Sequence, residues 1–461
     1  MEKQSTRVDT AIQELVANLG ERLSTVPSVC AQHGQDESFH KPHSPDAVAF
    51  VSSTEEVIEV VKICANHSVP IIPFGTGTSL EGHVAALSGG ICVDLTGMNE
   101  LLSINAADLD ATVQAGVTRR QLNENLRHEG LFFPIDPGAD ASIGGMAATR
   151  ASGTNAVRYG TMRENVLGLS AVMPDGRVIK TARRARKSSA GYDLTRLLVG
   201  SEGTLGIITE VTLRLYGVPE SVTCAVCSFP TLQAAVDTVI LTIQSGIPVA
   251  RIELLDDAMI DATNRFSKLD NALAPTLFLE FHGTRTGTEE QAEMVQQIAY
   301  DHKGGEFRWA SHAEDRNRLW RARHDAAYAA KALRPGCQMW PTDVCVPISR
   351  LAECISATKD DVDESFLMAP IVGHVGDGNF HLTFLVDPDC PKEIAEANRI
   401  NERLIDRALL MDGTCTGEHG VGYGKVDFLV AEHGEGVNIM QAIKSAIDPQ
   451  NIMNPGKVVR V

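Results

Sequence analysis

Four glycine-rich segments between residues 73 and 208 are the feature that most constrains what this chain can fold into. They are PFGTGTSLEG at 73–82, PGADASIGGM at 137–146, GTN at 153–155 with a Tyr-Gly pair at 159–160, and GSEGTLGII at 200–208. Glycine lets the backbone approach a ligand closely, and consecutive backbone N–H groups can cradle an anion. Four such segments exceed what turns require, so we expect a long, extended ligand to thread through one domain.

The first segment does not match the common nucleotide-binding loops. It follows VPIIPF, a short apolar run that is typical of a buried strand. Its residue 80 is Leu, so the GxGxxG pattern of nicotinamide-binding folds is missing, and no Gly-Lys-Ser/Thr follows to make a Walker A loop. Taken alone, the segment is explained as well by a tight turn as by an anion site.

Length and charge limit the kinds of protein that this chain can be. Its 461 residues are too many for one compact core and predict two or three domains. The formal net charge of −18 disfavours binding to nucleic acid. One basic run, RRARK at 183–187, breaks this acidic background. We interpret it as a solvated loop, with contact to an anionic cofactor or a protein partner as the alternative.

The apolar segments and the cysteines favour a cytoplasmic protein. No stretch reaches the ~18 uninterrupted apolar residues of a membrane helix, and the N-terminus lacks the apolar centre of a secretory signal. Ten cysteines in such a chain are expected to be reduced thiols. The CxxC pattern at 224–227 lies in an apolar run typical of a strand, where residues i and i+3 face opposite sides. We expect a core strand there rather than a zinc or redox site.

The pattern of strands and helices changes at Pro219. Before it, short apolar runs alternate with capped helices, such as the helix expected at 54–67 after STEE, which favours an α/β or α+β domain with long loops. After it, the order strand, helix, strand occurs twice over residues 221–310. That order predicts a ferredoxin-like sheet with helices on one face. Further strands are expected at 341–347, 369–375 and 381–386, and a helix at 391–410.

Two histidine-bearing segments stand out near the C-terminus. HVGDGNFH at 374–381 contains a turn-like GDGN, which can make His374 and His381 neighbours on adjacent strands, roughly 5 Å apart at Cβ. This suits two imidazoles on one divalent ion, and Glu418 in GEHGVG can supply an oxygen ligand. A His/His/Glu set favours Zn²⁺ or Mn²⁺. From spacing alone, a hairpin with two hydrogen-bonded histidines is the favoured alternative.

Long motifs in this chain resemble one flavoprotein family. PFGTGTSLEGH, DPGADASIGGMAATRASGTNAVRYGTMRENVLG and LLVGSEGTLGIITEVTLRL resemble the PCMH-type FAD-binding domain of the vanillyl-alcohol oxidase superfamily. HVGDGNFH, TGEHGVG and NIMNPGK resemble the C-terminal half of its D-2-hydroxyacid dehydrogenase branch. Within that branch, ARH at 322–324, LRPG at 333–336 and TDVCVP at 342–347 are most similar to cytochrome-type, FAD-dependent D-lactate dehydrogenases. The resemblance runs from about residue 40 to residue 458.

The resemblance implies an α+β fold with a two-part PCMH-type FAD-binding domain and a ferredoxin-like α+β substrate (cap) domain. The C-terminal segment is expected to return to the flavin site and to complete the FAD and metal sites. The implied divisions are an N-terminal helical segment at 1–40, the FAD-binding domain at 41–218, the cap domain at 219–410 and the C-terminal segment at 411–461.

The implied cofactor is FAD, held by residues of all four glycine-rich segments and by the C-terminal tail. Some superfamily members attach FAD covalently to a histidine, but Thr78 stands at that place here and His83 lies further on, so we expect non-covalent FAD. The expected FAD-binding residues are Pro73, Gly75, Thr76, Gly77, Thr78, Ser79, Leu80, Pro137, Gly138, Ala139, Ser142, Gly144, Gly145, Gly153, Asn155, Tyr159, Glu202, Gly203, Ile207, Ile208 and Asn454.

The resemblance also strengthens the metal interpretation, because the family places a divalent metal beside the flavin. His374, His381 and Glu418 are the expected ligands. His419 is the candidate general base, since a neutral histidine near pH 7 can accept a hydroxyl proton. Arg323 is the candidate partner of a substrate carboxylate, which a guanidinium can grip with two hydrogen bonds. A surface arginine on a helix over 314–333 is the alternative for Arg323.

The expected reaction is oxidation of a D-2-hydroxy acid, with D-lactate and pyruvate as the favoured pair. In the hydroxyglutarate branch a Lys stands where this chain has Thr342, and an Asn stands at Thr383, so a second substrate carboxylate is disfavoured. The alternatives are the flavoprotein subunit of a glycolate oxidase complex and a D-2-hydroxyglutarate dehydrogenase. We expect the electron acceptor to be a cytochrome, a quinone or an electron-transfer flavoprotein. We also expect a homodimer whose only membrane association is through that acceptor.

Overall fold

The computed structural model describes residues 2–461, which form two compact units. The first unit runs to Ser152 and includes Gly160–Val218 and Glu418–Val461, whereas the second comprises Gly153–Tyr159 and Pro219–Gly417. The sequence predicts divisions of the chain after residues 218 and 410. In the structure, the chain passes from one unit to the other after Val218 and after Gly417. We propose the FAD-binding and cap domains as the functional counterparts of these two units.

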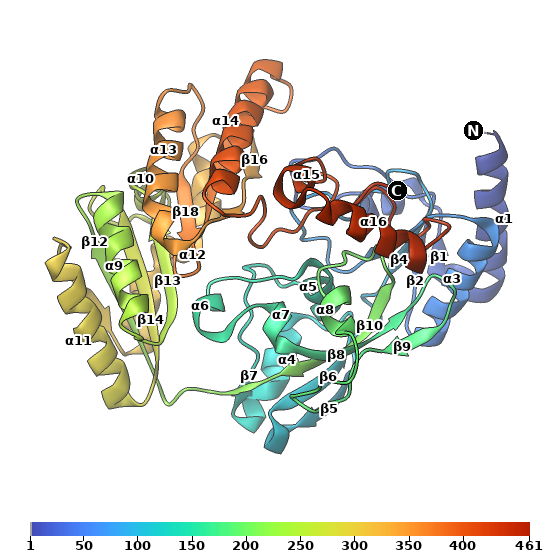
Figure 1. The fold of residues 1–461 in the computed structure, drawn as a ribbon, viewed down its shortest axis with the longest axis horizontal. Helices are drawn as coiled ribbons and strands as arrows, with labels where there is room; N and C mark the ends of the chain where they lie inside the picture. The colour runs from blue at the N-terminus through green and yellow to red at the C-terminus, as the bar shows by residue number, and fades with distance from the viewer. Residues whose placement is uncertain (1) are drawn as a thin grey trace. The chain divides into compact units, whose positions relative to one another are not determined.

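The first unit contains a small, mostly parallel sheet that is covered by helices (Figure 1). Its strands are β1 (Leu23–Ser24), β2 (Ala47–Phe50), β3 (Ile71–Phe74) and β4 (Ile91–Asp94), and its helices are α1 (Glu2–Leu19), α2 (Pro27–His33) and α3 (Thr54–His67). The strand order is β1-β2-β4-β3, with β2, β4 and β3 parallel. Leu15 of α1 and Val57 of α3 share one core with Ile71 and Val93. The apolar faces of both helices therefore cover the strand that carries the first glycine-rich segment.

A second, antiparallel sheet completes the first unit. Its strands are β5 (Leu101–Asn105), β6 (Asp110–Gln114), β8 (Val166–Val172), β9 (Val178–Lys180) and β10 (Ile207–Arg214), in the order β5-β6-β10-β8-β9. Val211 and Leu213 pack with Ile143 in its core. Short elements fill the connections: α4 (Arg119–Leu126), β7 (Leu131–Phe132), α5 (Ile143–Thr149), α7 (Met162–Asn165), α8 (Leu194–Leu198) and β11 (Tyr216–Gly217).

The C-terminal segment returns to the first unit, as expected. It contains α15 (Phe428–His433) and α16 (Gly436–Ile447). Ile443 and Ile447 pack on the core of the antiparallel sheet, and Met453 forms a bridge with Ile71 of β3. Residues distant in sequence thus share one core with the strand before the first glycine-rich segment.

The second unit is built on one eight-stranded sheet, in which seven strands form a row. The strands are β12 (Ser221–Ser228), β13 (Val249–Leu255), β14 (Thr276–Gly283), β15 (Arg308–Ala310), β16 (Gln338–Pro341), β18 (Ile371–His374) and β19 (Asn379–Val386), with β17 (Val344–Cys345) beside β19. The order β15-β12-β14-β13-β18-β19-β16 begins with the ferredoxin-like arrangement and extends it. The helices are α6 (Ala156–Tyr159), α9 (Leu232–Gln244), α10 (Asp257–Ser267), α11 (Arg285–Asp301), α12 (Ala313–Leu333), α13 (Leu351–Asp363) and α14 (Pro391–Leu410).

Helices cover both faces of this sheet. The helices of the two predicted β-α-β units, α9 and α11, pack against each other on one face, as expected, and α10 and α12 add a layer on the other. Thr223 of β12 donates a hydrogen bond to Thr288 of α11, whereas the next residue, Cys224, shares a core with Trp320 of α12. Neighbouring residues of a strand face opposite sides. The extra layer arises because α10 and α12 follow strands of the ferredoxin-like part and bring apolar faces of their own.

The CxxC pattern is a core strand, as expected. Cys224 and Cys227 are buried, unpaired thiols on β12. Burial raises the pKa of the Cys227 thiol to about 11 and that of Cys224 further still. Neither sulfur is held as a thiolate near neutral pH, which disfavours metal or redox chemistry here.

His33 and Asp94 form a buried pair in the first unit that makes its stability depend on pH. Nε2 of His33 lies 2.9 Å from Asp94 Oδ2, and its Nδ1 bonds the carbonyl oxygen of Val29 at 2.9 Å. Burial alone would lower the pKa of His33, but these hydrogen bonds outweigh it and raise the pKa above 6.5. The bonded, protonated form is therefore favoured in the folded state.

Because the pKa of His33 is raised in the folded state, its pair with Asp94 stabilises the fold fully at pH values below the pKa of the unfolded state. This stabilisation is lost as the pH rises through the pKa of the folded state. We expect the difference in unfolding free energy between wild type and His33→Asn to shrink as pH rises from below 6.5 to above the folded pKa. Urea unfolding across this range measures it. A difference that grew with pH would contradict the assignment, and His67→Asn, at an exposed ion pair with Glu14, is the control.

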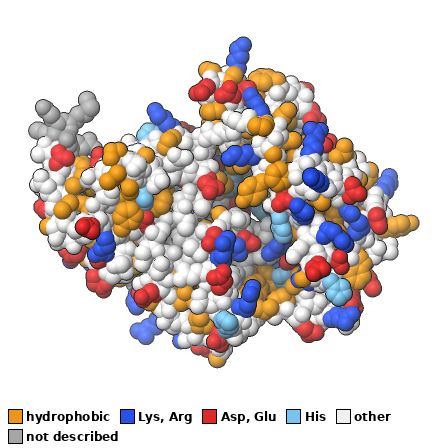
Figure 2. Space-filling view, turned by 180° about the vertical axis from the view of Figure 1, so that it is seen from behind, with side chains coloured by type: hydrophobic (Ala, Val, Ile, Leu, Met, Phe, Trp, Pro, Cys, Tyr) orange, Lys and Arg blue, Asp and Glu red, His pale blue; other side chains and the backbone are white. Residues whose placement is uncertain are grey.

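Acidic and basic side chains are interspersed on the face of the molecule drawn in Figure 2, and no large basic area stands out on that face. The run at 183–187 is exposed, and Arg184 pairs with Asp108 at 2.6 Å and with Asp110 at 2.9 Å. Across residues 2–461, every helix is too short or too polar to cross a membrane.

Candidate functional site

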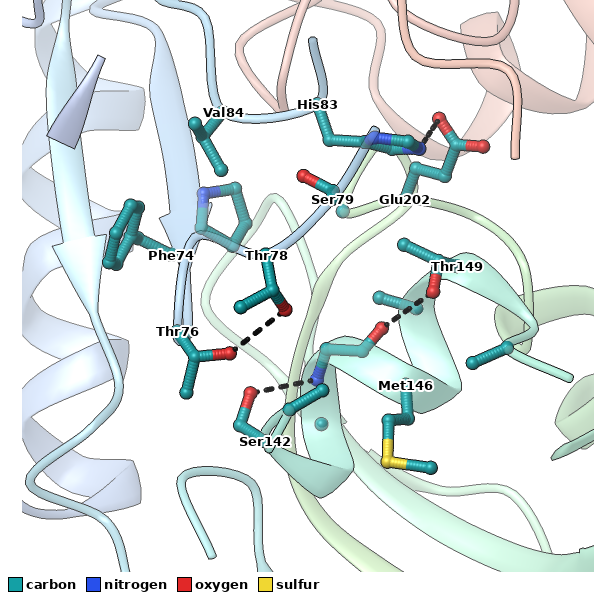
Figure 3. Close-up of a pocket in the computed structure, with 18 of the residues that line it drawn as sticks. Phe74, Thr76, Thr78, Ser79, His83, Val84, Ser142, Met146, Thr149 and Glu202 are labelled. Carbon is teal, nitrogen blue, oxygen red and sulfur yellow. Dashed lines mark hydrogen bonds and ion pairs between the residues drawn. The ribbon is translucent and has the colours of Figure 1, made fainter. Parts of the chain in front are cut away.

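The first, second and fourth glycine-rich segments line a cavity in the first unit (Figure 3). It encloses about 1210 Å³ of space not filled by atoms, including its opening to solvent. The expected FAD-binding residues that line it are Pro73, Gly75, Thr76, Gly77, Thr78, Ser79, Leu80, Pro137, Ala139, Ser142, Gly144, Gly145, Glu202, Gly203, Ile208 and Asn454.

Glycines let the walls of this cavity pack closely. A Cβ atom at Gly75 would lie 2.3 Å from the hydroxyl oxygen of Ser142, and one at Gly144 would lie 2.5 Å from the Cβ of Ala115. Real Cβ atoms do not approach other atoms so closely, so a side chain at either position would displace the opposite segment. At these two positions glycine is required for contact between segments of the protein, which the sequence pattern did not distinguish from contact with a ligand.

Five of the expected FAD-binding residues lie elsewhere. Gly153, Asn155 and Tyr159 belong to the second unit, and Ile207 is in the core beside β3, while Gly138 is outside the cavity lining. Oδ1 of Asn155 accepts a hydrogen bond from Arg251 at 2.8 Å, and the hydroxyl of Tyr159 lies 2.7 Å from Nδ1 of His282. The structure thus assigns Asn155 and Tyr159 to contacts with the eight-stranded sheet.

The cavity wall offers polar groups that fit an extended cofactor. Nδ2 of Asn454 donates to the carbonyl oxygens of His83 and Glu202 at 3.1 and 2.8 Å. Its Oδ1 and Nδ1 of His83 are buried without a hydrogen-bond partner among the described residues. The hydroxyls of Thr76 and Thr78 lie 3.3 Å apart at the same wall (Figure 3). Apolar side chains complete the lining, so the residues present fit FAD, which has polar phosphates and a largely apolar ring system.

Glu202 ties the C-terminal GEHGVG segment to this wall. Its carboxylate accepts hydrogen bonds from the backbone N–H groups of Val421 and Gly422 at 2.7 and 2.8 Å. It also lies 3.2 Å from Nε2 of His83, a buried pair drawn in Figure 3. Burial alone would lower the pKa of His83, but the Glu202 carboxylate outweighs it and raises the pKa. One buried carboxylate thereby contacts both the loop and a cavity-lining histidine.

Glu418 and His419 both line the cavity. Nδ1 of His419 lies 3.6 Å from Oε1 of Glu81, a buried carboxylate that also lies 3.1 Å from His40 and 3.2 Å from Lys425. Burial alone would raise the pKa of Glu81, but Lys425 and the two histidines hold it well below its ordinary value. The ionised carboxylate thus faces Nδ1 of His419 at a distance longer than a hydrogen bond.

Sequence analysis missed Glu81 and His83 as parts of this site. Glu81 stands in the first glycine-rich segment, and His83 directly follows the last residue of that segment. A glutamate after a turn is usually exposed, and only the shared burial of the two residues marks them. The signal that was available is their position close behind Leu80, at the end of a segment already assigned to a ligand.

The histidine hairpin lies in the second unit. The turn occupies residues 375–378, between β18 and β19, one residue earlier than GDGN. His374 pairs with Asn379, two residues before His381, so both imidazoles project from the same face as diagonal neighbours. Their ring centroids are 5.5 Å apart, and each ring offers a nitrogen within 4.8 Å of the other's.

Each imidazole of the hairpin is oriented through its Nδ1. His374 donates to Oε1 of Glu253 at 2.8 Å, and His381 donates to the carbonyl oxygen of Thr342 at 2.9 Å. Protonation of Nδ1 places the lone pair of each ring on Nε2. Two neutral imidazoles with this tautomer fit the ligand set of a divalent metal.

Glu253 also holds Arg323, the candidate partner of a substrate carboxylate. Nε of Arg323 lies 2.8 Å from Oε2 of Glu253, whose side chain is 1% exposed. Burial alone would raise the pKa of Glu253, but His374 and Arg323 lower it. Arg323 is thus anchored on α12 to a buried carboxylate, and its own side chain is 19% exposed.

Comparisons with solved structures show the fold. The p-cresol methylhydroxylase structure with bound substrate matches with a TM-score of 0.84 at 18% identity, covering 99% of this chain and 97% of that one. A 4-ethylphenol oxidase from Gulosibacter chungangensis matches with a TM-score of 0.81 at 18% identity, covering 98% of this chain and 97% of that one. These similarities confirm the expected PCMH-type architecture.

Comparisons with curated proteins give closer relatives. A probable mitochondrial D-lactate dehydrogenase of Danio rerio is 56% identical, covering 96% of this chain and 90% of that protein. The mitochondrial D-lactate dehydrogenase [cytochrome] of Arabidopsis thaliana is 49% identical, covering 97% of this chain and 80% of that protein. A glycolate oxidase subunit of Bacillus subtilis is 34% identical, covering 90% of this chain and 89% of that protein. The names of the first two relatives say mitochondrial, and the expected cytoplasmic location stays a prediction.

Two family models match this chain. Residues 45–182 match the FAD binding domain, and residues 218–458 match the C-terminal domain of FAD linked oxidases. The first match covers three of the four glycine-rich segments in full or in part, and the second contains the histidine hairpin and the GEHGVG loop. The chain therefore belongs to the family of FAD-linked oxidases and is an FAD-dependent oxidoreductase.

Proposed function

We propose that this protein oxidises D-lactate to pyruvate with FAD as its cofactor. The observation that carries the proposal is that His419 and Glu418, from the GEHGVG loop, line the same cavity as three of the glycine-rich segments. A polar, base-containing wall beside a cavity whose lining fits FAD is what oxidation of an alcohol carbon requires. The choice of substrate is supported by relatives named D-lactate dehydrogenase at 56% and 49% identity.

His419 is proposed to remove the proton of the substrate hydroxyl. Its Nδ1 lies beside Glu81, and Nε2 is the nitrogen proposed to accept the proton. The developing positive charge on the imidazole is favoured by the same carboxylate. Bound FAD supplies the acceptor for the hydride from the substrate carbon.

Arg323 is proposed to pair with the substrate carboxylate. Its Nε is fixed on Glu253, so the guanidinium plane is set before a substrate arrives. Thr342 and Thr383 are buried and uncharged, so neither can neutralise a second carboxylate. A short monocarboxylate such as D-lactate is therefore favoured over a 2-hydroxy diacid.

We further propose that His374, His381 and Glu418 hold a divalent metal, Zn²⁺ or Mn²⁺. The tautomers of the two histidines, set by Glu253 and by the carbonyl of Thr342, support the proposal. A metal there would lower the pKa of the substrate hydroxyl. The electrons are proposed to leave the protein to a cytochrome, as the name of the Arabidopsis relative suggests.

Anaerobic addition of 2-hydroxy acids to the purified holoprotein tests the function. We expect D-lactate to bleach the flavin absorbance completely, with one pyruvate formed per flavin. L-lactate should leave it unchanged, and D-2-hydroxyglutarate should act far more slowly because the uncharged Thr342 and Thr383 cannot pair with its second carboxylate.

Bleaching by glycolate but not by D-lactate would favour the glycolate oxidase alternative, for which the Bacillus subtilis relative is the precedent. No bleaching by any acid of the panel would overturn the proposal. Oxidation of reduced protein by cytochrome c, compared with a quinone, decides the acceptor.

A further inference from the structure

Glu253 stands at a junction between two residues that the proposed function needs. It lies on β13, where Leu254 pairs with Gly373 of β18, and this register brings Glu253 beside His374. One carboxylate oxygen accepts the Nδ1–H of His374 at 2.8 Å, and the other accepts the Nε–H of Arg323 at 2.8 Å. The side chain is fully buried, with 0% exposure of the residue.

A carboxylate in such a place is costly unless both its oxygens are paired. Each of its two partners comes from a different element, one from a strand and one from α12. Because the carboxylate is planar, fixing one oxygen on Arg323 also fixes the direction in which the other meets His374. The geometry of the hairpin histidine and of the arginine is therefore coupled through one side chain.

We propose that Glu253 is a positioning residue that sets the His374 ring for a divalent cation and the Arg323 guanidinium for a substrate carboxylate. The inference rests on the proposed function for the identity of the two ligands. Glu253 itself contacts neither of them, since both its oxygens face protein donors. Glu253 fixes the tautomer of His374 and the orientation of the Arg323 guanidinium. It thereby couples the affinity for the metal with the affinity for the substrate.

The neighbouring strand provides a matched control. Glu280 of β14 is also mostly buried and paired, with His282 at 2.7 Å and with Arg251 at 3.4 Å. Neither of its partners is a proposed ligand of metal or substrate. Glu280→Gln therefore has a structural cost similar to that of Glu253→Gln, but it leaves His374 and Arg323 untouched.

The test uses holoprotein that retains FAD: wild type, Glu253→Gln and Glu280→Gln. Mn²⁺ affinity is measured by calorimetric titration after chelation, and KM and kcat for D-lactate are measured in excess Mn²⁺. We expect Glu253→Gln to weaken Mn²⁺ binding by about 10- to 100-fold. We expect it also to raise KM for D-lactate by about 10-fold, because Arg323 loses a charge-assisted partner. Glu280→Gln should change neither quantity by more than about 2-fold.

The inference is overturned if Glu253→Gln binds Mn²⁺ and D-lactate as Glu280→Gln does. If Glu253→Gln loses FAD or does not fold, Glu253→Asp decides, because it keeps the charge but withdraws the carboxylate from both partners. Weaker Mn²⁺ binding by Glu253→Asp supports the inference, and wild-type affinity overturns it. Failure of the proposed function is distinguishable, since wild-type flavin would then resist D-lactate whatever the variants do.

Discussion

Replacing His419 with alanine is expected to slow reduction of the bound flavin by D-lactate by about 10²- to 10⁴-fold while FAD stays bound. The imidazole is the proposed acceptor of the hydroxyl proton, so its loss removes general-base catalysis. The glycine-rich segments that are expected to hold FAD are unchanged in this variant. Stopped-flow measurement of flavin bleaching under anaerobic conditions gives the rate, and flavin absorbance per chain gives the cofactor content.

His40→Ala is the matched control for this variant. His40 also lies beside the carboxylate of Glu81, at 3.1 Å, but it does not line the cavity. Its removal should change the bleaching rate by less than about 5-fold. Equal rates for His419→Ala and wild type would show that another group removes the proton. Equal losses in both variants would show that the charge of Glu81, rather than His419, is what matters.

Replacing Glu202 with alanine is expected to release FAD and to lower the free energy of unfolding by about 3 kcal/mol or more. The carboxylate accepts two backbone hydrogen bonds from the loop that follows His419, and it faces the buried His83. Hydrogen bonds to a charged group are the strong ones, and their donors at Val421 and Gly422 would be left without this acceptor. The FAD content after gel filtration and urea unfolding measure the two effects.

Glu202→Gln and Glu210→Gln complete the comparison. Glu202→Gln keeps one acceptor oxygen and should fall between wild type and alanine in both measurements. Glu210 of β10 accepts a hydrogen bond from Ser170 at 2.8 Å but is not part of the cavity lining, so its amide variant should retain FAD. Full FAD content in Glu202→Ala would contradict the role assigned to this carboxylate.

Local sequence patterns were sufficient for much of the fold. The capped helix at 54–67, the strand that contains the CxxC pattern and the ferredoxin-like order of β12 to β15 all depend on interactions between residues close in sequence or on hydrophobic periodicity. The additional helical layer of α10 and α12 was missed. Their apolar faces show that they are buried, but a single sequence does not show on which face of the sheet.

The candidate site divides in the same way. Motifs in the chain indicated most of the segments that line the cavity, because glycine-rich loops and the GEH triplet are compact in sequence. They did not indicate that Asn155 would contact Arg251 or that Tyr159 would contact His282. A glycine-rich loop can serve a ligand or a packed neighbour, and both uses have the same sequence signature.

The sequence by itself determined the family, the flavin-type cavity and the residue types that can carry the chemistry. Only the tertiary structure decided which carboxylates orient them. Glu81 lies far along the chain from His419, and Glu253 lies far from both Arg323 and His374. The physical reason is that a buried carboxylate is defined by the partners that offset its desolvation, and those partners meet only when distant strands and helices pack together.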